Sequence, residues 1–319
     1  MKCKVLAFYS FQTIENPEEM VKQWKEYLSA LNAKGRIYIN HEGINAQMSV
    51  PADADCDAWV LNHFPDADIK VQYYDEQPFD RLKIKLRKQL VALDMKVDME
   101  QKGAYLTPTE WKKVLEEQDE NTYVLDIRND YEWEVGHFEN AIRPPASTFR
   151  KFPPFAEKLA QELPKNARIL MYCTGGIRCE LFSPLLKSKG FDNVYQLHGG
   201  VIKYGLEEGS SHWKGKLFVF DDRLTVPISN ENSEVISHCS HCEKQADTYY
   251  NCANMDCNEL FISCKECAIQ LNGCCSEECT LADRVRPFDP EQKAKPFRKL
   301  SFEEKQQYKS LCCCNRNFL

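Results

Sequence analysis

The residues best suited to chemistry form the hexapeptide Cys173 to Arg178, with the order Cys-Thr-Gly-Gly-Ile-Arg. It follows the apolar run Arg168 to Tyr172, which predicts a buried strand, and it precedes a helix predicted from about Cys179 to Lys189. A cysteine in a loop at a helix N-terminus faces unpaired backbone N–H groups and the positive end of the helix dipole, and both favour a thiolate. We therefore predict that Cys173 is a nucleophile; a buried structural cysteine is the alternative interpretation.

The rest of this loop is expected to bind substrate around the sulfur. Two consecutive glycines let the backbone curl so that its amides point inward, and Arg178 is expected to close the loop and to donate to an anionic sulfur or oxyanion. Cys179 is expected to be a small packed side chain, with a resolving thiol as the alternative. The expected substrate-binding loop consists of Thr174, Gly175, Gly176 and Ile177.

A second group of chemically active residues is a cluster of cysteines late in the chain. Nine of the 16 cysteines fall in the 41 residues from Cys239 to Cys279, and in a reducing compartment such a cluster indicates metal binding. Their close pairs suit two interleaved tetrahedral sites, in which the first pair joins the third and the second joins the fourth. The predicted ligands are Cys239, Cys242, Cys264 and Cys267 for one site and Cys252, Cys257, Cys275 and Cys279 for the other.

Zinc is the expected metal, as two structural ions, with an iron–sulfur cluster or metal-free cysteines as the alternatives. Eight ligands leave one of the nine cysteines over, and Cys274 is expected to be that one. The run Cys312 to Cys314 lacks paired spacing and receives no assignment.

A third feature is the strict alternation of apolar and basic residues from Arg81 to Arg87. A strand here sends Leu82, Ile84 and Leu86 inward and four cations outward on one face. Two interpretations stay open: a solvated edge that its cations protect against aggregation, or a track for a phosphate backbone. The predicted RNA-binding residues under the second interpretation are Arg81, Lys83, Lys85 and Arg87.

The elements that position these residues begin with a domain over residues 1–88. Short apolar runs predict strands, three- and four-residue spacing of apolar side chains predicts two helices, and a Gly-containing turn at residues 41–43 predicts a hairpin. The order βαββαβ predicts a ferredoxin-like α+β sandwich. The predicted strands are 5–9, 36–40, 44–50, 69–74 and 81–87, and the predicted helices are 17–31 and 55–64.

A connector over residues 89–106 is expected to lead into an α/β domain over residues 107–220. Thr107, Pro108 and Glu110 predict a capping box that opens a helix. Strands alternating with helices then predict a parallel sheet covered on both faces. The predicted strands are 123–127, 141–144, 168–172 and 194–197; a cysteine-rich metal-binding segment follows at 235–283 and a basic tail at 284–319.

Composition sets the class of protein. With 43% hydrophobic and 28% charged residues the 319-residue chain is typical of a globular protein. Its net charge of -7 argues against a general polyanion binder, yet the basic tail carries nine Lys or Arg against four Asp or Glu and could meet an acidic partner. Without a long apolar run or a secretory signal, a cytoplasmic protein with no membrane partner and no stable protein partner is expected.

The α/β segment resembles the rhodanese domains. The resemblance covers about Thr107 to Lys216, and the four residues between Cys173 and Arg178 are the sulfur-sized loop, where the related phosphatases have five. The motifs that carry the resemblance stand in the family's order: Asp126-Ile127-Arg128, Glu132-Trp133, Gly136-His137, Asn140-Ala141-Ile142, the Cys173 loop and Leu197-His198-Gly199-Gly200.

Across nearly its whole length the chain resembles the bacterial rhodanese-type tRNA uridine-34 hydroxylases, through residues 35–49, 173–180 and 239–279. The resemblance implies oxygen-dependent formation of 5-hydroxyuridine at the wobble base of tRNA, with molecular oxygen as co-substrate and Cys173 as the essential residue. From the residues alone, a thiolate can attack C6 of uracil or carry a persulfide. A sulfurtransferase and a non-catalytic, zinc-bearing RNA-binding adaptor are the alternatives.

Overall fold

The computed structural model describes residues 2–117 and 119–291, and its first domain is a five-stranded sheet in the order β4-β1-β3-β2-β5. β1, β3, β2 and β4 pair antiparallel in the order of a ferredoxin-like sandwich, as predicted, and β5 adds a parallel edge strand beside β2. The strands are β1 (Cys3–Phe11), β2 (Lys34–Asn40), β3 (Gly43–Pro51), β4 (Lys70–Tyr74) and β5 (Leu82–Leu86).

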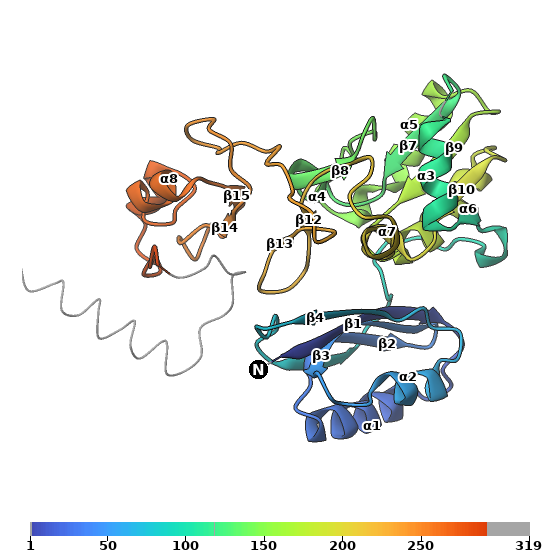
Figure 1. The fold of residues 1–319 in the computed structure, drawn as a ribbon, viewed down its shortest axis with the longest axis horizontal. Coiled ribbons are helices and arrows are strands. Elements are labelled where there is room, and N and C mark those ends of the chain that lie inside the picture. Colours follow the sequence, from blue (N-terminus) through green and yellow to red (C-terminus); the bar gives the residue numbers. More distant parts are fainter. Residues whose placement is uncertain (1, 118, 292–319) are drawn as a thin grey trace, which may run out of the picture. The chain divides into compact units, whose positions relative to one another are not determined.

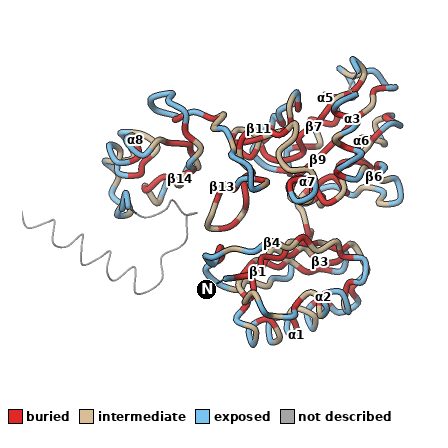
Figure 2. The backbone as a smooth tube through the Cα atoms, in the orientation of Figure 1, coloured by how far each residue is buried: buried red, intermediate tan, exposed pale blue. Residues whose placement is uncertain are grey.

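Two helices, α1 (Pro17–Ala30) and α2 (Asp57–His63), cover one face of this sheet (Figure 1). The Asn16 side chain caps α1 by accepting from the Glu19 amide, and the helix buries Trp24 and Leu28. β1 and β3 are buried along most of their length (Figure 2). The opposite face of the sheet is therefore the one that remains available for the next domain.

The second domain contains a parallel sheet in the order β6-β10-β9-β7. The predicted capping box at Thr107 is present at the start of α3. The strands of this domain are β6 (Ala104–Leu106), β7 (Thr122–Asp126), β8 (Gly136–Phe138), β9 (Arg168–Tyr172), β10 (Val194–Leu197), β11 (Trp213–Gly215) and β12 (Leu217–Phe218). The helices are η1 (Met99–Gln101), α3 (Pro108–Glu116), α4 (Asp130–Val135), η2 (Phe149–Lys151), α5 (Pro153–Glu162), α6 (Ile177–Ser188) and α7 (Gly200–Glu208).

Two expectations for this domain are wrong. The predicted strand 141–144 is reduced to one isolated bridge between Ile142 and Leu125, because Pro144 and Pro145 lack the N–H groups that a strand needs. The connector 89–106 is part of the domain, since β6 pairs with β10 and Leu93 lies in the same apolar core as β9. A three-residue strand is too short for its alternation to be read from sequence.

Residues 219–226 and 235–291 form a separate compact unit. β14 and β15 pair antiparallel, and the buried apolar cluster around them is small, containing Cys252, Ala253, Phe261 and Cys274. The elements of this unit are β13 (Thr225–Val226), β14 (Tyr249–Asn251), β15 (Leu260–Ile262), α8 (Lys265–Gln270) and α9 (Glu277–Thr280). Within the described ranges of the whole chain, no helix has the length and apolarity needed to cross a membrane.

Candidate active site and metal centres

Cys173 lies between the end of β9 and the start of α6, and only 1% of it is exposed. The Gly176 amide donates to its sulfur at 3.1 Å. Gly176 has a φ of +103°, a conformation that side chains rarely adopt, and a Cβ there would lie 2.8 Å from the Tyr9 hydroxyl. Gly176 thus lets the loop turn its amide toward the sulfur, while at Gly175 a Cβ would meet no atom within 4 Å.

The surroundings of Cys173 favour its thiolate. Burial opposes ionisation, but a hydrogen bond from the Cys179 thiol, the charge of Arg178 and the backbone amides of both residues together lower the pKa of Cys173 to about 6. Burial, together with the hydrogen bond to Cys173, raises the pKa of Cys179 well above its usual value. Cys179 is therefore a packed thiol that also donates to Cys173, a role that the sequence did not reveal.

Arg178 closes the loop through a partner that sequence reasoning missed. Its guanidinium forms two bonds to the Glu132 carboxylate, at 2.5 and 2.8 Å, and a third to Thr174 Oγ1 at 3.2 Å. Glu132 is fully buried; burial opposes its charge, but Arg178 keeps its pKa below the usual value. Arg178 thus closes the loop through a buried ion pair, and its charge also acts on Cys173; the Glu132-Trp133 motif was the available signal for the partner.

We expect Arg178→Ala to destabilise the protein by about 3 to 5 kcal/mol, because it leaves the buried Glu132 carboxylate without its partner. Loss of the positive charge should also raise the pKa of Cys173 and lower turnover. Urea unfolding and turnover of the purified variant measure the two effects. Unchanged stability and turnover would refute this role; Arg178→Lys, which keeps the charge but loses the bidentate geometry, should show a smaller defect.

A second buried carboxylate, Glu180, lies one turn into α6. It accepts hydrogen bonds from the phenols of Tyr9 and Tyr105 at 2.9 Å and pairs with Lys102 at 2.7 Å. Tyr9 belongs to β1, so this carboxylate ties the face of the N-terminal sheet to the helix that carries the catalytic loop. None of the four residues of this network was predicted from the sequence to be part of the site.

The basic strand β5 differs in one respect from the expectation. Leu82 and Ile84 pack partly against the core. Leu86 is paired with the buried Ile39 and so lies on the predicted face, but it is 47% exposed, so it is less buried than expected. β5 is an edge strand with β2 as its one neighbour in the sheet, so its end is only partly covered. The Arg87 guanidinium lies 4.9 Å from the centroid of the Tyr38 ring, a cation–π contact.

Arg87 also lines a cleft of about 1570 Å³ beside residues 88–102. We call it the basic cleft, because five cations face two carboxylates there. Its charged lining residues are Arg87, Lys88, Lys96, Lys102, Arg150, Glu42 and Asp94, and its aromatic ones are Phe11 and Tyr38. Cations together with aromatic rings are typical of surfaces that bind single-stranded nucleic acid.

Only the start of the predicted basic tail is described. Arg284 pairs with Asp256 at 2.6 Å, and Arg286 donates to the backbone carbonyls of Asn251 and Cys252. Both arginines therefore form their polar contacts within the cysteine-rich unit. Residues 292–319, including Cys312 to Cys314, lie outside the described residues.

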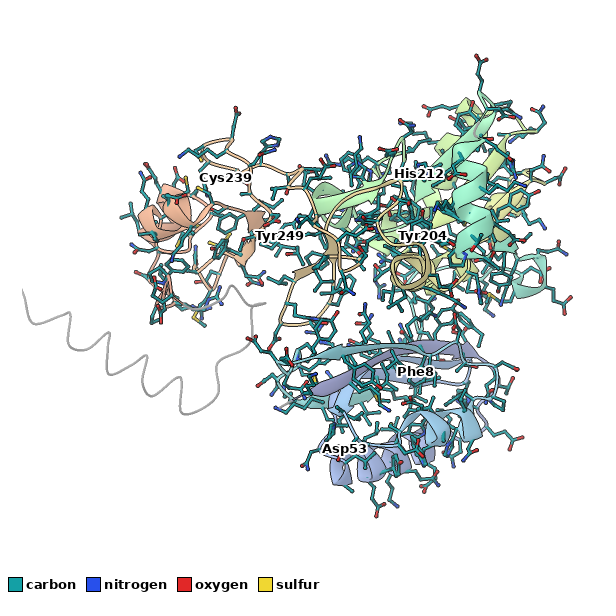
Figure 3. All side chains as sticks on the ribbon, viewed as in Figure 1. Phe8, Asp53, Tyr204, His212, Cys239 and Tyr249 are labelled. Atoms are coloured by element: carbon teal, nitrogen blue, oxygen red, sulfur yellow. The ribbon has the colours of Figure 1, made fainter. Side chains whose placement is uncertain are left out.

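The eight predicted ligand cysteines gather into two groups in the C-terminal unit, where Figure 3 labels Cys239. The groups are Cys239, Cys242, Cys264, Cys267 and Cys252, Cys257, Cys275, Cys279, the combination that the spacing predicts, and Cys274 is in neither. Sulfurs at 2.3 Å from one tetrahedral zinc are about 3.8 Å apart. Cys242 and Cys264 are separated by 3.7 Å and Cys257 and Cys275 by 3.6 Å, so these donor sets fit zinc.

Polar groups around the two cysteine groups support this fit. In the first group the Cys267 amide donates to the Cys264 sulfur at 3.5 Å. In the second the Cys275 amide donates to the Cys252 sulfur at 3.3 Å, and the Asn254 side-chain amide donates to the Cys279 sulfur at 3.4 Å. Hydrogen-bond donors to the sulfurs stabilise thiolate ligands and fix their orientation. Both groups therefore have the composition and the surroundings of structural metal sites.

Three family models match the chain: a UPF0176 acylphosphatase like domain at residues 3–90, a Rhodanese-like domain at 107–207 and a Rhodanase C-terminal model at 214–280. The tRNA uridine(34) hydroxylase of Chlamydia felis is 48% identical over 320 residues, covering 98% of both chains. The protein of the same name from Protochlamydia amoebophila is 50% identical over 301 residues, covering 92% of this chain and 93% of its own. With such identity over nearly its full length, the chain belongs to the tRNA uridine(34) hydroxylase family.

Proposed function

We propose that this protein hydroxylates uridine 34 of tRNA at C5, with molecular oxygen as co-substrate and Cys173 as the essential residue. The observation that carries the proposal is near full-length similarity to tRNA uridine(34) hydroxylases in a chain whose Cys173 has a pKa of about 6. At neutral pH such a cysteine is mostly thiolate, the nucleophilic form. A thiolate that approaches C6 of uracil raises electron density at C5, the position to be hydroxylated.

The residues of the loop stabilise this thiolate, which is to react with the uracil base. The Gly176 amide and the Cys179 thiol donate to the sulfur, while the Arg178–Glu132 pair supports the loop from within the domain. Because Cys173 is buried, a base still stacked in the anticodon has no access to it. The nucleotide must therefore be extruded from the stack before it meets the sulfur.

We assign the two cysteine groups a structural role as zinc sites, on the fit of their donor sets. Both lie in the small C-terminal unit, which has little apolar core of its own. A tRNA substrate and a set of described cysteines that carry no disulfide both suit the cytoplasm, and we place the protein there.

Nucleoside analysis of tRNA tests this function. Deleting the gene should remove 5-hydroxyuridine and its derivatives at position 34, and a plasmid copy should restore them. Unchanged 5-hydroxyuridine in a strain without the protein or a paralogue would contradict the proposal. Thiosulfate and cyanide test the sulfurtransferase alternative, since rapid thiocyanate formation through Cys173 combined with normal tRNA would favour it.

We expect RNA binding to depend on four cations in and beside β5: Lys83 and Lys85 lie in the strand, and Arg81 and Arg87 flank it. Replacing Arg81, Lys83, Lys85 and Arg87 by Gln should weaken tRNA binding and reduce the salt dependence by up to about four phosphate contacts. Arg87 connects this strand to the basic cleft, whose surplus of positive charge suits a phosphate backbone. Filter binding at several salt concentrations measures both quantities.

A matched control removes the same charge elsewhere, through Gln at Lys22, Lys25, Lys113 and Lys158, which are exposed residues on α1, α3 and α5. The control should bind tRNA nearly as well as the wild type. If the β5 variant also keeps the affinity and salt slope of the wild type, its cations belong to a solvated edge strand and the docking model is wrong.

A further inference from the structure

Lys70, the first residue of β4, carries a buried ammonium group beside the catalytic loop. Its side chain is 4% exposed, and Nζ donates to the Gly175 carbonyl at 3.4 Å. The same nitrogen lies 5.3 Å from the centroid of the Tyr9 ring. Burying an ammonium is costly unless other groups compensate it, so a lysine in this position calls for a physical reason.

The only carboxylate paired with Lys70 among the described residues is Asp68, at 3.3 Å. Asp68 is shared, because Lys203 approaches it at 3.4 Å and His198 at 3.8 Å. One negative charge therefore faces two lysines and an imidazole at the mouth of the loop. A surplus of positive charge remains there, and its most buried member is Lys70, for which solvent screening is weakest.

The contact between β4 and the loop is supported on the other side by Tyr9. Its hydroxyl donates to Glu180 at 2.9 Å and approaches Gly176 closely enough that any Cβ there would clash. Tyr9 and Lys70 belong to neighbouring strands, β1 and β4, and both reach residues of the Cys173 loop or of α6. The loop is thus bounded by two side chains that the N-terminal domain supplies.

We propose that Lys70 is a positioning residue of the active site: its buried ammonium stabilises the Cys173 thiolate and holds the Gly175 carbonyl so that the loop amides stay turned toward the sulfur. This inference rests on the proposed role of Cys173 as a thiolate. It makes the N-terminal domain part of the catalytic apparatus in addition to any part it has in RNA binding. Burial lowers the pKa of Lys70; Asp68 opposes that shift most, and the Cys173 thiolate opposes it as well, which agrees with mutual stabilisation.

Several other groups act on the same sulfur, so the effect of Lys70 must be separated from theirs. Arg178 and Cys179 on α6 act most directly. The remaining titratable or charged groups around the loop are Tyr9 on β1, Asp68 before β4, Glu132 on α4, Glu180 on α6, His198 after β10 and Lys203 on α7. A Lys70 variant leaves all of these residues in place. Asp68 loses Lys70 as a partner there but keeps Lys203 and His198, so the shift reports the loss of the Lys70 charge.

The test is alkylation of Cys173 in the intact protein, followed by mass spectrometry of the Cys173 peptide across pH. Lys70→Gln should raise the apparent pKa of Cys173 by about 0.5 to 1 unit, because a nearby positive charge is lost. Lys70→Arg keeps the charge and should stay within about 0.2 unit of the wild type. The ratio of the rates with iodoacetate and iodoacetamide should fall about threefold in Lys70→Gln, since the anionic reagent loses an attractive charge.

Lys4→Gln is the matched control. Lys4 is also a buried lysine of the N-terminal domain, paired with Asp57 at 2.9 Å, but its partner lies away from the loop, on α2. It should leave both readouts unchanged. If Lys70→Gln matches Lys4→Gln in apparent pKa and in reagent ratio, Lys70 is a structural residue only and the inference is wrong. Neither readout uses tRNA, so this result is independent of whether uridine 34 is the substrate.

Discussion

Cys173→Ser should abolish formation of 5-hydroxyuridine while leaving the fold intact. Serine preserves the shape of the side chain, but its hydroxyl is hardly ionised at neutral pH and cannot replace a thiolate whose pKa is about 6. We expect a loss of at least about 1000-fold, typical of removing a nucleophile. Nucleoside analysis of tRNA from a strain that carries only the serine variant measures it, and wild-type levels of modified uridine would refute the role of Cys173.

The same thiolate predicts the pH dependence of the reaction. Above about pH 6 Cys173 is mainly ionised, so activity should be level there, and it should decline as the pH falls through about 6 and the sulfur takes up a proton. Cys179→Ala removes a hydrogen-bond donor to the thiolate, so the acidic limb of the pH–activity profile, where activity declines, should move to higher pH. A limb that stays in place in Cys179→Ala would show that this donor is unimportant.

Removal of metal should unfold the C-terminal unit. Its buried apolar cluster is small, so the two cysteine groups must supply much of its folding free energy, on the order of 10 kcal/mol per site. Protein purified without chelator should contain about two zinc ions per chain. A strong chelator should expose the cysteines of this unit to thiol reagents while the catalytic domain keeps its structure.

Two cysteine variants test the assignment of the ligands. Cys257→Ser removes a ligand of the second group and should lower the metal content to about one ion per chain. Cys274 precedes the ligand Cys275 in the chain but belongs to neither group, so Cys274→Ala should keep about two ions per chain. Less than about one ion in the wild type, or equal losses in both variants, would count against the two-site arrangement.

Much of this protein could be predicted from its sequence, because the features concerned depend on local patterns of residues. The capping box at Thr107, the turn between β2 and β3, the glycines after Cys173 and the pairing of eight cysteines all depend on residues close together in the chain. Such features follow from hydrogen bonding and ligand geometry over a few residues. The ferredoxin-like fold of the first domain could be predicted in the same way, because the order of its strands and helices is visible in the local hydrophobic patterns.

Only the tertiary structure decided which side chains surround the sulfur. Arg178 meets Glu132 across 46 residues, Gly175 meets Lys70 across 105, and Glu180 meets Tyr9 across 171. Each contact joins separate elements, and no periodicity within an element specifies which distant residue it will face. The sequence by itself determined that Cys173 stands in a thiolate-forming loop; the docking of elements far apart in the chain decided which buried charges stabilise that thiolate, because these charges act through space rather than along the chain.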